Sequence, residues 1–348
     1  MIHFVVNPTA RCGYGKKVWS QVIEPILCSE KLEYEAHFSE NAGDIATICY
    51  DLYRKNHAVT YSCTKTSIPA DGKTEPRKDT SEEPHEDTQT AINDEISANT
   101  LTVIIVGGDG SLNEAIRLIP DFNNIVLGYI PSGSGNDLAR DLKIKRNPGK
   151  ALYHLLHQPT IRTMDLAFLE YEDHQVRPFL ISCGIGFDAA VCEKLSSSRI
   201  KEALNRVKLG KLAYLATALK ELVTAKRSEA KLVLSDDTTV IIPKLLFLTG
   251  MIHAYEGGGF RFTPQAIDDD GFLDVCAVGN IPKAIALLIL PLAFFGKHYV
   301  SKHIRHYRAK EIHVSTKDAL WVHTDGEVTR KSTSFHVRCM KQWLTLRY

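Results

Sequence analysis

The chain has 348 residues, a length that predicts about two domains and leaves ample material for a buried core. Its composition, 44% hydrophobic and 24% charged, is ordinary for a globular protein and argues against a collagen-like, fully disordered or integral-membrane chain. Lys and Arg number 42 against 41 Asp and Glu, so the formal net charge is +1 and we expect no nucleic-acid partner.

The chain opens with two strand–loop–helix units. Residues 2–6 (IHFVV) predict a strand, and a glycine-containing loop leads from it into residues 16–27, whose apolar positions have helical spacing. Residues 34–38 predict a second strand, which is followed by a turn and by a helix from about 44 to 53.

The segment from about 63 to 100 has a different character. It contains PADGKTEPRKDTSEEPHEDTQT, which is rich in Pro, Asp, Glu, Lys and Thr and has no aromatic residue. Such a composition cannot bury enough apolar surface to offset the entropy lost on ordering. We expect an inserted, disordered loop, with a regulatory or partner-binding role as the alternative to a plain surface insertion.

Two further strands end in polar, glycine-rich loops. Residues 101–106 (LTVIIV) are typical of a strand buried on both faces, and they run directly into GGDGS at 107–111. Residues 125–130 predict another strand, which leads into PSGSGND at 131–137. The alternation of strands and helices predicts an α/β domain with an open, doubly wound parallel sheet.

Beyond about residue 160 strands dominate. Helices are expected only around 210–225 and 282–295, and no internal repeat is visible. This pattern predicts a β-rich second domain, in the form of a sandwich. The expected strands are 164–170, 177–184, 230–234, 239–250, 273–278, 311–315 and 334–338.

Targeting and membrane signals are weak. The N-terminus has no apolar leader and the eight cysteines form no C-x-x-C pair, so we expect a cytosolic protein with reduced cysteines and no zinc ribbon. The most apolar stretch, residues 284–296, is too short to span a bilayer and contains Pro291. Two interpretations stay open, a buried helix or an apolar surface that meets a lipid or a bilayer face.

The loop at 107–111 is a candidate phosphate cradle. Ligands of open α/β sheets lie at the carboxyl ends of the strands, and glycine lets backbone N–H groups approach a polyanion. Asp109 would lie among the phosphates, where an acid is usually explained by a bound Mg²⁺ ion. The alternative is a strand-to-helix turn in which Asp109 caps the helix. The chain lacks a Walker motif and a G-x-G-x-x-G after its first strand, which disfavours a P-loop NTPase and a Rossmann dehydrogenase.

Seven motifs occur in chain order: VVNPTARCG (5–13), SENAGDIA (39–46), GGDGSLNE (107–114), PSGSGNDLAR (131–140), SCGIGFDAAV (182–191), GGGFRFTPQAIDDDGFLDV (257–275) and HTDGEV (323–328). Together they resemble the diacylglycerol kinase catalytic-domain family of lipid kinases, which includes bacterial diacylglycerol kinases, YegS-type lipid kinases, sphingosine kinases and ceramide kinases. GGDG alone also occurs in NAD kinases and phosphofructokinases, from which the second glycine-rich loop and the D-D-G motif separate this chain.

The resemblance implies a lipid kinase that uses ATP and Mg²⁺ and transfers the γ-phosphoryl group to a lipid hydroxyl, first of all that of diacylglycerol to give phosphatidic acid. It implies a Mg-ATP-binding domain of the NAD kinase/diacylglycerol kinase-like α/β fold at 1–145 and a β-rich lipid-substrate domain at 146–335. A C-terminal segment, 336–348, is expected to return towards the first domain. The implied setting is the cytoplasm, peripheral to a membrane that presents the lipid, and a homodimer is compatible with it.

The resemblance also implies residue roles. Asp270 matches the family's general base, since a carboxylate can accept the proton of a substrate hydroxyl. Asp109 is the rival base as well as the expected metal ligand, and a plain acidic turn is the alternative for Asp270. Ser182 departs from the family, which usually has Asn there. The implied nucleotide-binding residues are Asn7, Thr9, Arg11, Ser39, Gly107, Gly108, Asp109, Gly110, Ser111, Asn113, Ser134, Asn136, Asp137 and Glu327.

Alternative functions stay open from the sequence. The lipid could instead be a sphingoid base, a ceramide or phosphatidylglycerol. An NAD kinase-like enzyme would phosphorylate a soluble ribose. A catalytically dead lipid- or nucleotide-binding module is a third alternative, against which the retention of Asp109, Asn136, Asp137 and Asp270 argues.

Overall fold

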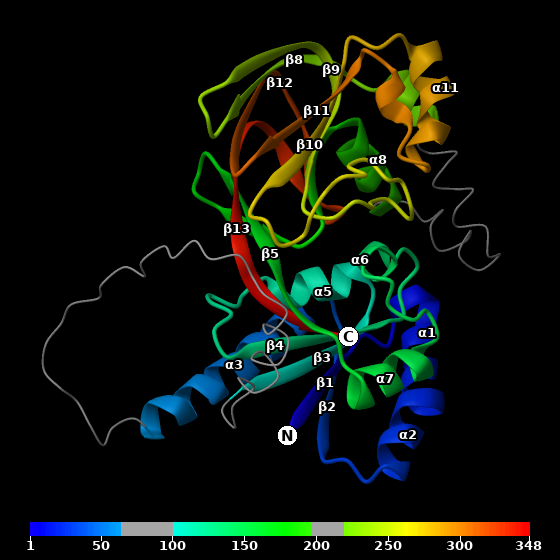
Figure 1. Ribbon diagram of the computed structural model, residues 1–348, viewed down its shortest axis with the longest axis vertical. Coiled ribbons are helices and arrows are strands. Elements are labelled where there is room, and N and C mark those ends of the chain that lie inside the picture. Colours follow the sequence, from blue (N-terminus) through cyan, green and yellow to red (C-terminus); the bar gives the residue numbers. More distant parts are fainter. Residues whose placement is uncertain (64–99, 197–218) are drawn as a thin grey trace, which may run out of the picture.

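The computed structural model describes residues 1–63, 100–196 and 219–348 (Figure 1). The insertion expected at 63–100 therefore lies almost entirely outside the described residues, as does most of the helix expected around 210–225. The described chain forms an α/β part that contains both chain ends and a β-rich part next to it (Figure 1).

The α/β part is built on the predicted parallel sheet. β1 (Ile2–Val6) lies between β2 (Tyr34–Phe38) and β3 (Leu101–Gly107), and β3 pairs with β4 (Ile125–Pro131). Every residue of β3 and β4 is buried, as their unbroken apolar runs predict. Because all four strands are parallel, their carboxyl ends share one edge of the sheet.

The helix predicted at 16–27 is present but irregular. Arg11, Cys12 and Gly13 at its start all have positive φ, so the chain makes a left-handed bend there before the regular helix begins. The helices of this part are α1 (Ala10–Val18), the π-helical turn η1 (Trp19–Ile23), α2 (Glu24–Ser29), α3 (Asp44–Cys63), α5 (Asp109–Ile116), α6 (Asp137–Asp141) and α7 (Pro148–His157).

The second part is β-rich, as predicted, and its strands pair in antiparallel fashion around an apolar core of their own. The helix expected at 282–295 is present as α11 (Lys283–Ala293), beside α8 (Phe187–Ser196) and the 3₁₀ turn η2 (His298–Val300). The strands are β5 (Ile161–Tyr171), β6 (Val176–Phe179), β7 (Ser182–Gly186), β8 (Ser228–Leu234), β9 (Thr239–Met251), β10 (Leu273–Gly279), β11 (Ile304–Ala309), β12 (Glu311–Thr324) and β13 (Glu327–Arg347).

The last strand joins the two parts. β13 is 21 residues long and pairs with β12 in the β-rich part and with β5 along most of its length. Its final residues, Thr345–Arg347, pair in parallel with β4, so that the two parts share one continuous sheet (Figure 1).

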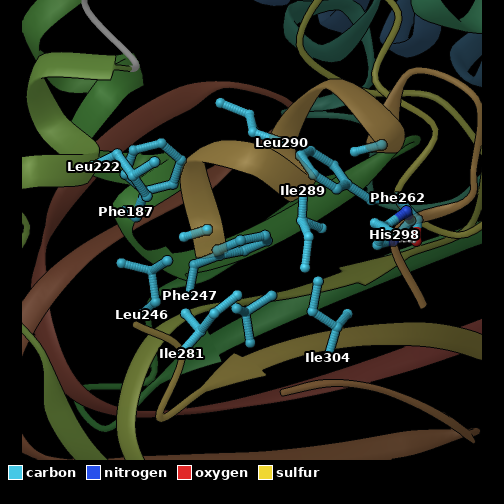
Figure 2. A pocket seen from close by; sticks show the side chains of 13 residues that line it. Phe187, Leu222, Leu246, Phe247, Phe262, Ile281, Ile289, Leu290, His298 and Ile304 are labelled. Carbon is cyan, nitrogen blue, oxygen red and sulfur yellow. Dashed lines mark hydrogen bonds between the residues drawn. The ribbon is translucent and has the colours of Figure 1, made fainter. Parts of the chain in front are cut away.

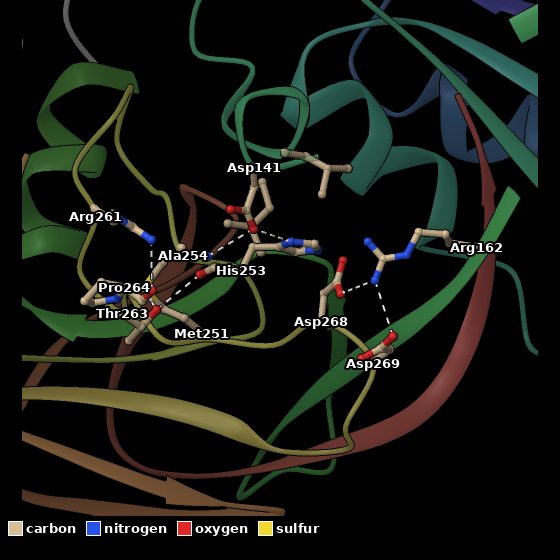
Figure 3. A network of polar contacts seen from close by, with 12 residues as sticks. Asp141, Arg162, Met251, His253, Ala254, Arg261, Thr263, Pro264, Asp268 and Asp269 are labelled. Carbon is tan, nitrogen blue, oxygen red and sulfur yellow. Dashed lines mark hydrogen bonds and ion pairs between the residues drawn. The ribbon is translucent and has the colours of Figure 1, made fainter. Parts of the chain in front are cut away.

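Polar side chains lock this junction of strands. Asp165 of β5 is fully buried and accepts the backbone N–H groups of Gly271 at 2.6 Å and Gln342 at 2.7 Å. Arg162, at the start of β5, binds Asp268 at 2.7 Å and Asp269 at 3.3 Å (Figure 3). The acidic segment before β10 is thereby fastened to the two strands that run between the parts.

Candidate active site

Two glycine-rich loops touch at the carboxyl edge of the parallel sheet. A Cβ atom on Gly133, after β4, would lie 2.5 Å from the Cα of Gly108, after β3. A Cβ on Gly107 would lie 2.4 Å from the Cβ of Ser111, one turn further on. The backbone N–H of Ser132 donates to the carbonyl of Gly107 at 2.7 Å. Glycine is needed at Gly133 because the two backbones pack directly on each other, and at Gly107 because a side chain would overlap that of Ser111.

The rim of the loops is open and suits a phosphate group. Helix α5 begins at Asp109, and the first N–H groups of a helix have no intrahelical acceptor. Among the described residues, no side chain caps this end of α5, and none lies within 4 Å of a Cβ placed on Gly110. Ser134 of the neighbouring loop is exposed. The residues present therefore fit the phosphates of ATP, which the helix N-terminus would also favour by its partial positive charge.

Asp109 ties the first loop to the second. Its carboxylate accepts the backbone N–H groups of Asp137 at 2.8 Å and Leu138 at 3.3 Å, and the Tyr129 hydroxyl at 3.4 Å. Burial raises the pKa of Asp109 to about 7, and the negative charges of Asp137 and Asp325 add to this shift. Asp109 thus caps a helix, as the structural alternative predicted, but the helix is α6 and not its own.

Asn7 links the first loop of the chain to the phosphate loop. Its Nδ2 donates to the Ser111 hydroxyl at 2.9 Å, and its Oδ1 accepts from the N–H and the hydroxyl of Thr9 at 3.1 and 2.9 Å. Ser39 is buried, and its backbone N–H donates to a backbone carbonyl of β1. The guanidinium group of Arg11 lies over a tyrosine ring. The structure brings Asn7, Thr9 and Ser111 together.

The second loop reaches the β-rich part. Asn136 has positive φ, and its Nδ2 donates to the carbonyl of Gly133 at 3.0 Å. Asp137 pairs with Arg140 and accepts the backbone N–H of Gly258 at 2.7 Å. Asp141, at the end of α6, binds His253 at 2.8 Å in the same way across the two parts (Figure 3).

Asn113 joins α5 to the D-G-E turn between β12 and β13. Its Nδ2 donates to Asp325 at 2.8 Å and to the carbonyl of Pro178 at 3.2 Å. The Asp325 carboxylate also accepts three backbone N–H groups, those of residues 180, 181 and 182, at 2.8–2.9 Å. Burial raises its pKa. Sequence reasoning did not single out Asp325, and the D-G-E motif was the only signal for it.

Glu327 makes a second link between the same elements. It forms an ion pair with Arg117, at the end of α5. Burial raises the pKa of Glu327, and Arg117 acts against that shift. Asn113 and Glu327, both expected at the nucleotide, are thus engaged in contacts between the two parts.

Asp270 lies in different surroundings. It forms an ion pair with Arg308 of β11 and accepts the backbone N–H of Phe272 at 3.0 Å. Its neighbours Asp268 and Asp269 bind Arg162. These contacts are those of an acidic turn that anchors β10 and β11, and none of them involves Asp109 or the glycine-rich loops.

An apolar pocket lies in the β-rich part between α11 and the sheet (Figure 2). Its cavity volume is small, about 30 Å³, and the pocket is partly open to solvent. Its walls are aliphatic and aromatic side chains, such as Phe247 on the sheet side and Leu290 on the helix side, and His298 is the one side chain among the lining residues with a polar group. Apolar side chains are also exposed on the outer face of α11 and in the turn that follows it: Leu288 is 76% and Phe295 71% exposed.

Comparison with known families settles the class of protein. The Diacylglycerol kinase catalytic domain matches residues 69–169, and the YegS C-terminal NAD kinase beta sandwich-like domain matches residues 182–346. This chain belongs to the diacylglycerol kinase family of lipid kinases. Membership implies the use of ATP, and it makes this lipid kinase a combination of an α/β catalytic region and a β-rich C-terminal domain.

Individual relatives agree with this assignment. The lipid kinase is 26% identical to a Bacillus subtilis (strain 168) protein provisionally named lipid kinase YtlR, over 93% of this chain and 92% of the relative. It is 27% identical to the diacylglycerol kinase of Mycobacterium tuberculosis over 67% of this chain and 72% of the relative. A Bacillus anthracis structure provisionally titled a diacylglycerol kinase has the same fold, with a TM-score of 0.66, 20% identity and coverage of 100% of this chain and 94% of the other.

Proposed function

We propose that this lipid kinase transfers the γ-phosphoryl group of ATP to the free hydroxyl of diacylglycerol, giving phosphatidic acid and ADP. The observation that carries the proposal is the double role of α5. Its N-terminus opens onto the phosphate rim, and one turn later Asn113 holds Asp325 of the β-rich part. The name of the Mycobacterium tuberculosis relative supports diacylglycerol as the lipid.

Asp325 is a better candidate for the general base than Asp270. Residues four apart lie on one face of a helix, so Asp109 and Asn113 face the same side of α5. Asp325 is bound to Asn113 and is close enough to Asp109 to raise its pKa. To accept a proton, Asp325 must release one of its four donors, and the side chain of Asn113 is the donor that can move. Asp270 has no comparable link to the phosphate rim.

The carboxylate of Asp109 suits Mg²⁺, which prefers oxygen ligands. Asp109 lies in the phosphate loop itself, and its burial, together with the charges of Asp137 and Asp325, makes its ionised form unfavourable without a cation. When bound there, Mg²⁺ would neutralise charge on the phosphoryl group in transfer. The protein's own contribution is to hold the Asp109 carboxylate in place by the two N–H groups of α6.

The lipid would reach the β-rich part from a membrane face. The 36 residues between Asp274 and Glu311 include six Lys and Arg and no Asp or Glu, and they carry the exposed apolar face of α11. A basic surface with protruding apolar side chains is complementary to an anionic leaflet. No helix of the described residues is long and apolar enough to cross a bilayer. The exposed apolar side chains and the basic residues of this segment support our proposal that the enzyme works at the cytoplasmic face as a peripheral protein; a homodimer stays a prediction.

A panel of lipids tests the proposal. The purified protein is incubated with labelled ATP, Mg²⁺ and detergent-dispersed diacylglycerol, sphingoid base, ceramide or phosphatidylglycerol, with free NAD as the soluble acceptor, and the products are separated on one thin-layer plate. We expect the strongest labelling with diacylglycerol. Labelling of another lipid alone would change the substrate, and labelling of NAD alone would overturn the assignment of a lipid acceptor.

A further inference from the structure

A buried group of three ionisable side chains lies directly behind the D-G-E turn. His323 of β12 is fully buried, and its Nε2 is 3.1 Å from Asp188 and 3.2 Å from Glu256. Both carboxylates are at least 90% buried as well. A Cβ on Gly184 would lie 2.0 Å from the Asp188 carboxylate, so the neighbouring strand keeps a glycine where the cluster needs room.

The other ring nitrogen of His323 shows what this group does. Nδ1 accepts the backbone N–H of Gly326 at 3.2 Å, so the proton of the neutral ring is on Nε2 and points at the two carboxylates. A histidine that binds a metal through Nε2 needs an acceptor, not a donor, opposite Nδ1. The cluster therefore fits a shared proton and does not fit a metal ion, although its three side chains are close enough to hold one.

The charges agree with a shared proton. Burial raises the pKa of Glu256 to about 7, and Asp188 adds to this shift. Glu256 and Asp188 raise the pKa of His323 against the effect of its burial, but a second proton on the ring would lie on Nδ1 and point at the N–H of Gly326. Both shifts mean that the cluster holds one proton more than the isolated groups would at pH 7. Because Nδ1 faces an N–H group, that proton belongs on the Glu256 side of the ring.

The Gly326 bond matters because the turn has an unfavourable backbone. Asp325 and Gly326 both have positive φ, 48° and 79°, a conformation that costs a residue with a side chain about 1 kcal/mol or more. The bond from Gly326 to His323 helps to hold the turn in this state. In this positive-φ conformation the turn directs the Asp325 carboxylate to the backbone of residues 180–182 and to Asn113.

We infer that His323 is a positioning residue for the kinase reaction: through Gly326 it fixes the D-G-E turn and so the direction of the Asp325 carboxylate. Asp188 and Glu256 hold the imidazole in the tautomer that this requires. The inference rests on the proposed function in so far as Asp325 acts on the lipid hydroxyl.

Two substitutions test the contacts of the two ring nitrogens of His323 separately. In His323→Asn the side-chain oxygen can occupy the place of Nδ1 and accept from Gly326, while the contact with Asp188 and Glu256 is lost. In His323→Gln the amide reaches towards the carboxylates, and the acceptor for Gly326 is lost. We expect kcat to fall on the order of a hundredfold in His323→Gln and less than tenfold in His323→Asn. The KM for ATP should stay within about twofold in both, because the phosphate rim is untouched.

Glu256→Gln is the third variant. Asp188 still accepts the Nε2–H of His323 in it, so the tautomer and the turn should be kept and kcat should fall less than tenfold. An equal fall of kcat in His323→Asn and His323→Gln, or a wild-type kcat in His323→Gln, would overturn the inference. If His323→Gln does not fold, His323→Asn is compared with Glu256→Gln instead. The inference says that the Asn oxygen can replace Nδ1 of His323. A fall of kcat by more than a hundredfold in His323→Asn, but not in Glu256→Gln, would therefore contradict it.

A measurement that needs no substrate distinguishes failure of the inference from failure of the proposed function. In ¹⁵N-histidine NMR spectra of the wild type, assigned by comparison with His323→Asn, the Nδ1 of His323 should be unprotonated and its Nε2 protonated at pH 7. A protonated Nδ1 would overturn the inference whatever the enzyme phosphorylates. Absence of lipid kinase activity together with the expected tautomer would leave His323 holding the turn and would refute the proposed function instead.

Discussion

Asn113 of α5 donates to the Asp325 carboxylate at 2.8 Å, and this bond connects the helix behind the phosphate loop with the D-G-E turn 212 residues further along the chain. The two residues come from the two parts of the protein. α5 begins at Asp109 and binds Asp325 through Asn113. The carboxylates of Asp109 and Asp325, which come from different parts of the protein, therefore lie on one side of this helix. The active site proposed here is the place where the two parts meet.

The assignment of the base predicts opposite results for two conservative substitutions. Asp325→Asn should lower kcat about 10²- to 10⁴-fold with ATP binding retained, because the amide cannot take up the hydroxyl proton. Asp270→Asn should keep kcat within about tenfold, since Asp270 pairs with Arg308 away from the phosphate rim. Steady-state assays on the best lipid, with ATP binding measured directly, check both. A dead Asp270→Asn beside an active Asp325→Asn would return the base to Asp270.

The raised pKa of Asp109 predicts a dependence of stability on pH. An acid with a raised pKa in the folded state keeps a proton that the unfolded chain has lost, so stability falls as pH rises from about 4 to about 7. Between pH 5 and pH 8 the wild type should lose roughly 2 kcal/mol more unfolding free energy than Asp109→Asn, whatever the constant offset between them. Urea unfolding at both pH values measures this. Parallel pH profiles of the two proteins would show that Asp109 ionises freely.

The contact between the two glycine-rich loops predicts a contrast between two alanine substitutions. Gly133→Ala places a Cβ 2.5 Å from the Cα of Gly108 and should lower the unfolding free energy by about 1–3 kcal/mol. Gly110→Ala adds a methyl group in open space within a helix and should leave stability unchanged or raise it by up to about 1 kcal/mol. Thermal unfolding of both variants makes the comparison, and equal stability would mean that the loops do not pack as described.

The exposed apolar side chains on α11 and in the turn after it predict membrane binding. Leu288→Glu with Phe295→Glu should weaken sedimentation with vesicles of phosphatidylcholine and phosphatidylglycerol at least tenfold, because each apolar side chain gains about 1.5–3 kcal/mol on burial. Val176→Glu, on β6, is the control, since Val176 is also an exposed apolar residue, at 51%. Binding by the wild type should weaken in high salt if the basic residues contribute. Equal binding by all three proteins would place the membrane contact elsewhere.

Local sequence determined the elements and the class of the protein. The mainly apolar runs of β3 and β4 are buried along their whole length, since a strand covered on both faces is built largely from apolar residues. The glycines after these strands marked the loops at the edge of the sheet. The order of the motifs indicated the lipid kinase family, and the α/β part, the β-rich part and α11 are where the patterns predicted them.

Only the tertiary structure decided which acids meet. Asp270 and Asp325 each precede a glycine in the sequence, and nothing local distinguishes them. The pairing of β13 with β5 and β4 brings the D-G-E turn to Asn113, whereas the turn at Asp270 is fastened to Arg308 and to β5. Likewise, Asp109 caps α6, a helix 28 residues away, instead of its own. Such partners are set by strand pairing over long sequence separations, which a local pattern does not encode.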